Sequence, residues 1–119
     1  YWNDDTEMTY PLILAKIPVK NPWEIFAYLP FGNWNDCPDT PELMAAAKYW
    51  FEQYGAVPAA MSHDELEFLL PAPVPKDKAV EVAVELYGFC PDLDQDEDGS
   101  IGVLADALWQ STVWYLWWD

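Results

Sequence analysis

Residues 40–70, TPELMAAAKYWFEQYGAVPAAMSHDELEFLL, decide the fold, because a helix pattern passes directly into a hairpin pattern. Asp39 or Thr40 can cap the helix, Pro41 suits its first turn, and Gly55 supplies a stop. The apolar side chains in between recur at helical spacing, at Leu43, Ala47, Trp50, Phe51 and Tyr54. The pattern predicts a helix over residues 40–54.

The stretch that follows has the period of two that is typical of strands. Along residues 65–70, ELEFLL, apolar side chains stand at every second position from 66 onward. Residues 56–62 and 65–70 are therefore predicted to form a hairpin that turns at His63-Asp64.

The flanking sequence predicts further elements. Residues 11–19 (PLILAKIPV) and 112–119 (TVWYLWWD) are strand candidates, and residues 23–29 are ambiguous between helix and strand. A second helix is expected over residues 76–87, and a third follows Ser100 as its cap. The inward positions expected for these two helices are Val80, Ala83, Val84 and Tyr87, with Gly88 as stop, and Ile101, Leu104, Ala105 and Leu108.

Together these elements predict an α+β fold: a small, mainly antiparallel sheet of about four strands with about three helices packed on it. Residues 10–119 are expected to form a single domain. Residues 1–9 are interpreted as a leader or linker remnant.

The chain combines strong acidity with a large apolar content. It has 21 acidic residues, five lysines and no arginine, giving a net charge of −16, yet 52% of residues are hydrophobic and eight are tryptophans. A packed core inside a negative shell is expected. Direct binding to nucleic acid or to an anionic membrane is disfavoured, because both need clustered basic side chains. The composition is compatible with a basic protein, a cation or a neutral ligand that stacks on aromatic rings, and also with mimicry of nucleic acid in a basic groove. A protein is the expected partner.

The two cysteines, Cys37 and Cys90, each begin a Cys-Pro-Asp tripeptide. They could be a redox pair, part of a metal site, or a nucleophile with His63 as its base. The alternative, which we favour, is that each is a small buried residue where a helix meets a loop. Two cysteines do not make a disulfide scaffold, and no signal peptide or membrane span is visible, so a cytoplasmic location with reduced thiols is expected.

The acidic loop over residues 94–101 resembles the first part of a calcium-binding loop. The run DQDEDGSI over residues 94–101 places oxygen ligands at alternate positions, namely Asp94, Asp96, Asp98 and Ser100. Ala105 stands where a calcium loop has its bidentate glutamate. The loop can therefore be a weak Ca²⁺ site, or a solvated acidic turn before a capped helix.

Exposed aromatic residues beside polar ones could anchor a partner. The candidates are Trp34, Asn35, Trp117, Trp118 and Asp119. Alternation along the last strand predicts that Trp114, Leu116 and Trp118 share one face, opposite Val113, Tyr115 and Trp117.

The runs PWEIFAYLPFGNWNDCP, LYGFCPD and STVWYLWWD together resemble a bacterial family catalogued as domain of unknown function 4253. The resemblance implies a shared fold and no assigned catalytic residue. Two departures stand out: Gly32-Asn33 replaces a usual Gly-Gly pair, and the run from 94 to 98 is unusually acidic.

The sequence favours a non-enzymatic, acidic protein-binding module, of which an immunity or inhibitor-like protein is one version. A Ca²⁺-binding domain using the loop at residues 92–100 is one alternative. A hydrolase using cysteine or carboxylate chemistry is the other.

Overall fold

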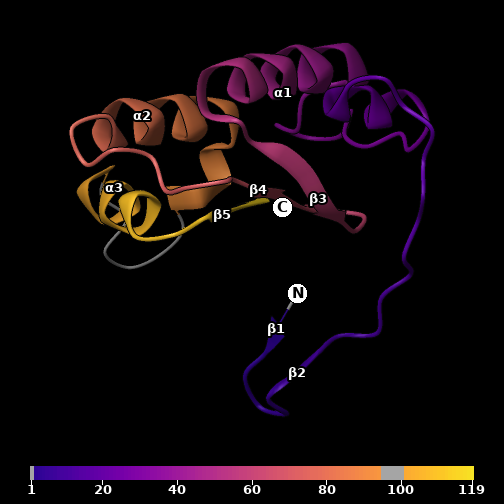
Figure 1. Cartoon of the computed structure of the whole chain (residues 1–119), viewed down its shortest axis with the longest axis horizontal. Helices are drawn as coiled ribbons and strands as arrows, with labels where there is room; N and C mark the ends of the chain where they lie inside the picture. The colour runs from indigo at the N-terminus through magenta and orange to yellow at the C-terminus, as the bar shows by residue number, and fades with distance from the viewer. Residues whose placement is uncertain (1, 95–100) are drawn as a thin grey trace.

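The computed structural model describes residues 2–94 and 101–119, and its elements form one compact body with an extended N-terminal segment (Figure 1). In chain order the elements are β1 (Trp2–Asn3), β2 (Met8–Thr9), the 3-10 helix η1 (Pro22–Ala27), α1 (Thr40–Tyr54), β3 (Val57–Met61), β4 (Glu65–Leu69), α2 (Ala79–Phe89), the 3-10 helix η2 (Pro91–Asp94), α3 (Ile101–Trp109) and β5 (Val113–Trp117).

Helix α1 has the predicted bounds, because its two ends are specified locally. The Asp39 side chain accepts a hydrogen bond from the Glu42 N–H at 3.1 Å. At the other end Gly55 has a φ of 73°, the left-handed conformation that ends many helices, and its N–H donates to the Phe51 carbonyl. Trp50 is among the residues that the helix buries.

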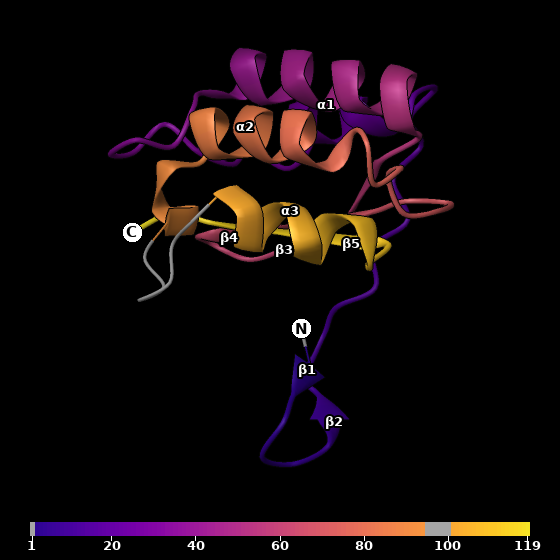
Figure 2. The ribbon, with the colours of Figure 1, turned by 90° about the vertical axis from the view of Figure 1, so that its left-hand side faces the viewer.

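The sheet has the order β3-β4-β5 and is antiparallel throughout. Phe68 of β4 stands opposite Trp114 of β5, and both are buried with Leu66 and Leu116 on one face. Helices α1 and α2 lie over that face (Figure 2), and the Trp50 ring meets the Phe68 ring edge-on at 5.5 Å between centroids. The α+β class, the hairpin and the alternation along the last strand are confirmed.

The strand expected over residues 11–19 is wrong. These residues run extended without strand pairing, and the short ribbon of β1 and β2 lies beyond them, away from the body (Figure 1). Their apolar, β-branched composition favours the strand conformation. A strand also needs a second strand beside it to pair its backbone N–H and C=O groups, however. Pro11 and Pro18 each remove one backbone donor.

The ambiguity at residues 23–29 resolves as η1. The Glu24 carboxylate accepts hydrogen bonds from the N–H groups of Lys20 and Asn21, at 3.1 and 3.0 Å, and so fixes the start of this turn. These bonds lower the pKa of Glu24. Phe26 is fully buried and pins η1 to the core.

Helix α2 differs from its prediction in bounds and in face. It begins at Ala79 and continues through Gly88 to Phe89, and Pro91 follows its end. Its buried residues are Ala79, Val82, Ala83 and Leu86, so Val80, Val84 and Tyr87 of the predicted face are exposed. Apolar residues occupy nearly every position of AVEVAVELYGF, and the periodicity therefore does not distinguish its faces. For α3, the predicted inward positions Ala105 and Leu108 are buried.

Candidate functional site

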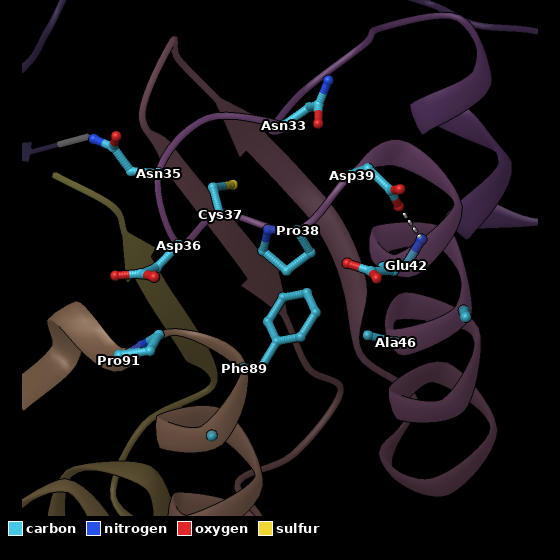
Figure 3. A pocket seen from close by; sticks show the side chains of 12 residues that line it. Asn33, Asn35, Asp36, Cys37, Pro38, Asp39, Glu42, Ala46, Phe89 and Pro91 are labelled. Atoms are coloured by element: carbon cyan, nitrogen blue, oxygen red, sulfur yellow. Dashed lines mark hydrogen bonds between the residues drawn. The ribbon is translucent and has the colours of Figure 1, made fainter.

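An open cleft of about 700 Å³ lies between the loop of residues 33–39, the first turns of α1 and the end of α2 (Figure 3). Its polar lining comes from Asn33, Asn35, Asp36, Asp39 and Glu42. The rest of its lining is small or apolar: Cys37, Pro38, Ala45, Ala46, Gly88, Phe89 and Pro91. Figure 3 shows Pro38, Glu42 and Phe89 converging on the cleft from these three segments.

The loop that forms one wall needs residues that tolerate a left-handed backbone. Gly32, Asn33 and Asn35 have φ values of 89°, 67° and 45°. The Asn33 N–H donates to the Pro38 carbonyl at 3.0 Å, which closes the loop. A Cβ at Gly32 would overlap that same Pro38 carbonyl oxygen. Asparagine can therefore stand at position 33, since asparagine tolerates the left-handed conformation as glycine does.

The three motifs that carry the family resemblance meet beside the cleft. The Asn35 side-chain amide donates to the Asp119 carbonyl oxygen at 2.7 Å, and the Asp119 N–H donates to the Asp92 carboxylate at 3.0 Å. Asn35 belongs to the first motif, Asp92 to the second and Asp119 to the last. Asp119 is thus held between the loop that contains Asn35 and the segment after α2 that contains Asp92.

Contacts between aromatic rings connect this junction to the hydrophobic core. Phe31 contacts Trp34 and Trp118 edge-on, with centroids 5.2 and 5.6 Å apart. The Trp118 ring also packs on Phe89 of α2, at 5.9 Å. The wall of the cleft is therefore continuous with the hydrophobic core.

The residues predicted to bind a partner have different surroundings. Trp34 is half-buried, whereas Asn35 and Asp119 are exposed. Trp117 is half-buried, and its indole N–H donates to Asp64 at 3.2 Å. Trp118 is only 1% exposed. The expectation of a surface role for Trp118 is therefore corrected: its side chain belongs to the core, because it alternates inward with Trp114 and Leu116.

Both cysteines are free and buried. Burial, reinforced by the charge that Cys90 would carry, raises the pKa of Cys37 to about 12. Burial raises the pKa of Cys90 to about 11. Its thiol donates a hydrogen bond to the Trp117 carbonyl at 3.0 Å. Thiols of this kind are weak nucleophiles at neutral pH.

The only histidine is far more accessible than either thiol. The His63 side chain is 90% exposed at the turn of the β3–β4 hairpin, and its Nε2 lies 3.3 Å from the Asp64 carboxylate. It does not line the cleft, whereas Cys37 does.

Most of the proposed calcium loop lies outside the described residues. This applies to Asp96, Asp98 and Ser100, while Asp94 ends η2. Over residues 2–94 and 101–119, no group of three or more His, Cys, Asp or Glu side chains could hold a metal ion.

Sequence reasoning missed Glu42, Phe89 and the alanines of α1 as parts of one site. The available signal was the repeated Cys-Pro-Asp tripeptide, since one copy directly precedes α1 and the other follows α2. Only the pairing of the two helices brings these copies to the same side of the molecule.

The fold and the cleft define a small α+β domain with an acidic, partly apolar recess. The chain belongs to the family described as Domain of unknown function (DUF4253), whose model matches residues 13–119. No curated protein and no solved structure matches the chain. Among the described residues, no helix has the length and apolar character needed to cross a membrane.

Proposed function

We propose that this domain is a non-enzymatic protein-binding module whose cleft receives a basic segment of a partner protein. An immunity or inhibitor-like role in the bacterial cytoplasm is one concrete version of this function. The observation that carries the proposal is the composition of the cleft, which combines carboxylates at its rim with an apolar floor.

The rim favours a cation over an anion. Asp36, Asp39 and Glu42 contribute carboxylates, and no lysine lines the cleft. The start of α1 would ordinarily attract an anion through its free N–H groups. Here Asp39 already accepts the Glu42 N–H, and Pro41 has no N–H to offer. A bound anion would therefore meet three negative groups and few donors.

The floor suits the alkyl part of a basic side chain. Pro38, Ala46 and Phe89 present carbon atoms to the cleft. Lysine and arginine bury their methylene stems against apolar surface while the charged head remains near water or an acid. A segment that carries lysine or arginine next to an apolar residue matches both parts of the lining.

The charge of the whole chain supports the same kind of partner. A net charge of −16 attracts basic proteins over a distance of about one Debye length, roughly 8 Å at physiological salt. Long-range attraction raises the rate of association, and contacts in the cleft then determine how long the complex persists.

The thiols support binding over hydrolysis. Among the described residues that line the cleft, Cys37 alone has a side chain of the kind a cysteine hydrolase uses as nucleophile. Its pKa of about 12 keeps the thiol protonated at neutral pH. His63, the only histidine, does not line the cleft.

Calorimetric titration with a short peptide of alternating lysine and leucine tests the proposal, with the glutamate-leucine counterpart as control. We expect binding of the lysine peptide alone. The double variant Asp36→Asn, Glu42→Gln should weaken the affinity for the lysine peptide roughly five- to thirtyfold. The variant removes two ion pairs, and each exposed pair contributes about 0.5–1 kcal/mol. Asp39 is left unchanged, since it caps α1.

The matched control is Glu52→Gln, which removes one exposed negative charge near the far end of the same helix. It should change the affinity by less than about twofold, as expected for a screened charge away from the contact. Equal weakening by Glu52→Gln and by the double variant would reduce the interaction to non-specific attraction and contradict the proposal. Absence of binding by the wild-type protein would contradict it as well.

A further inference from the structure

Gly88 lines the cleft, yet the fold itself gives no reason for a glycine at this position. Position 88 lies inside α2, and its φ is not positive, unlike that of Gly32 or Gly55. Apart from its two chain neighbours and the backbone of α2, no described atom lies within 4 Å of the place that a Cβ would take. Glycine inside a helix costs stability relative to alanine. The open space beside Gly88 therefore suits a ligand better than it suits the fold.

The end of α2 also presents carbonyl groups that are not engaged within the described part of the chain. The helix ends at Phe89, and Pro91 prevents it from continuing. The carbonyls of Gly88 and Phe89 accept no hydrogen bond from any described residue. Both residues line the cleft. The end of the helix is therefore an acceptor site that carries partial negative charge.

The other two segments of the cleft add two carboxylates. The side chains of Asp36 and Glu42 form no hydrogen bond or ion pair with the described residues. Figure 3 shows Asp36 on the loop, Glu42 on α1 and Phe89 at the end of α2. All three segments thus offer acceptors, and a ligand that satisfies them needs several hydrogen-bond donors together with positive charge.

We propose that Gly88 admits the main chain of an extended basic segment, which passes over the end of α2 and donates its N–H groups to the carbonyls of Gly88 and Phe89. This mode of binding rests on the proposed function and specifies it, because it gives the conformation of the segment and a residue that determines specificity. A lysine or arginine of the segment then reaches the carboxylate of Asp36 or Glu42. A side chain at position 88 would occupy the path of the main chain.

The available acceptors favour an extended segment over a helix. In an α-helix the N–H groups beyond the first turn bond to carbonyls of the same helix. An extended segment keeps main-chain N–H groups free for a partner. Basic side chains alone could pair with the carboxylates, but their contacts would not require a glycine at position 88. The glycine and the two free carbonyls together therefore indicate a close approach of the main chain.

Calorimetric titration of Gly88→Ala and Gly88→Leu with the alternating lysine-leucine peptide tests this mode of binding. We expect Gly88→Leu to weaken the affinity roughly tenfold or more, the loss expected when one or two hydrogen bonds to the main chain cannot form. Gly88→Ala should have a smaller effect. Both variants should melt no lower than the wild-type protein, since the space is open and both residues form helices better than glycine.

The matched control is Gly102→Leu, the same substitution at an exposed glycine of α3 that does not line the cleft. It should leave the affinity unchanged. Wild-type affinity in Gly88→Leu would overturn this mode of binding and leave the proposed function standing. Absence of binding by the wild-type protein would instead contradict the proposed function, and this mode of binding with it.

Two further peptides, titrated into the wild-type protein, test the conformation of the segment. The first has the same lysine and leucine content arranged with the helical period, and the second is the alternating peptide N-methylated along its main chain, which removes its N–H donors. We expect each to bind roughly tenfold more weakly than the alternating peptide. Equal affinity of either peptide would overturn the extended main-chain contact.

Discussion

Asn35 donates a hydrogen bond from its side-chain amide to the main-chain carbonyl of Asp119, and 2.7 Å separate the two atoms across 84 positions of sequence. The bond joins the loop that walls the cleft to Asp119, which follows β5 and the buried Trp118. Because Asp119 is also held by Asp92, the cleft, the end of α2 and the last strand form one connected unit. Stability and ligand binding should therefore be coupled at this junction.

Replacing Asn35 should separate the contribution of this bond from that of the backbone. Asn35→Gly removes the amide and keeps the left-handed conformation accessible, so we expect a loss of about 0.5–1 kcal/mol in the free energy of unfolding. Asn35→Ala loses the same bond and also forces alanine to a φ of 45°, which should add roughly 1 kcal/mol. Urea denaturation of both variants gives the comparison. Equal stability of the two would show that the loop does not require the left-handed conformation at position 35.

Gly32 and Gly88 predict opposite effects of the same substitution. Gly32→Ala should lower the free energy of unfolding by more than about 3 kcal/mol, because a Cβ would overlap the Pro38 carbonyl and φ is 89°. Gly88→Ala should raise it by up to about 1 kcal/mol, since position 88 is helical with open space around it. Thermal melts in parallel test both. Similar melting temperatures for the two variants would contradict the loop geometry.

The buried thiols predict a loss of stability at high pH. In the folded chain the pKa of Cys37 is about 12 and that of Cys90 about 11, against an ordinary value of 9.0. Between pH 9 and these values, the unfolded chain loses thiol protons that the folded chain retains. Stability is therefore fully present below pH 9 and falls above it, by up to about 1.4 kcal/mol per pH unit for each thiol.

The variant Cys37→Ala checks the assignment, by denaturant unfolding at a series of pH values. It should start from a lower stability near neutral pH because it leaves a small cavity, and should then decline less steeply above pH 9. A slope equal to that of the wild-type protein would mean that Cys37 does not titrate as its burial requires.

The effect of Ca²⁺ on the melting temperature distinguishes the proposed protein-binding function from the alternative of a Ca²⁺-binding domain. If residues 94–101 are only a solvated acidic turn, millimolar CaCl₂ and MgCl₂ should shift the melting temperature equally, through screening of the net charge. A larger shift with Ca²⁺, abolished by Asp96→Asn together with Asp98→Asn, would support a Ca²⁺-binding domain. Differential scanning calorimetry provides the readout.

Local signals explain which parts of the fold could be predicted from the sequence. Helix α1 has a cap at Asp39 and a stop at Gly55, so its bounds need no tertiary information. The alternation around Trp114 likewise identifies the buried face of β5. The strand at residues 11–19 could not be judged in this way, because its formation depends on a neighbouring strand, and none of the described strands pairs with these residues. The buried face of α2 could not be identified from the sequence, because apolar residues of the helix itself occur on all its sides.

The cleft was less predictable than the fold. Asn35 and Asp119 were both singled out from the sequence, but nothing local indicates that they touch. Its position beside Asp119 makes Trp118 a candidate partner anchor in the sequence, whereas alternation along the strand places its side chain inside. Glu42 and Phe89 have the composition of ordinary helix residues. Their role follows only from the packing of α2 beside α1.

A nitrogen–proton correlation spectrum of labelled protein, recorded during titration with the lysine-leucine peptide, tests most directly whether the cleft is the binding site. We predict that the amide signals of residues 33–46 and 88–92 shift together, and that those of the sheet strands β4 and β5 stay in place. Shifts confined to these strands, or spread evenly over the acidic surface, would contradict the account.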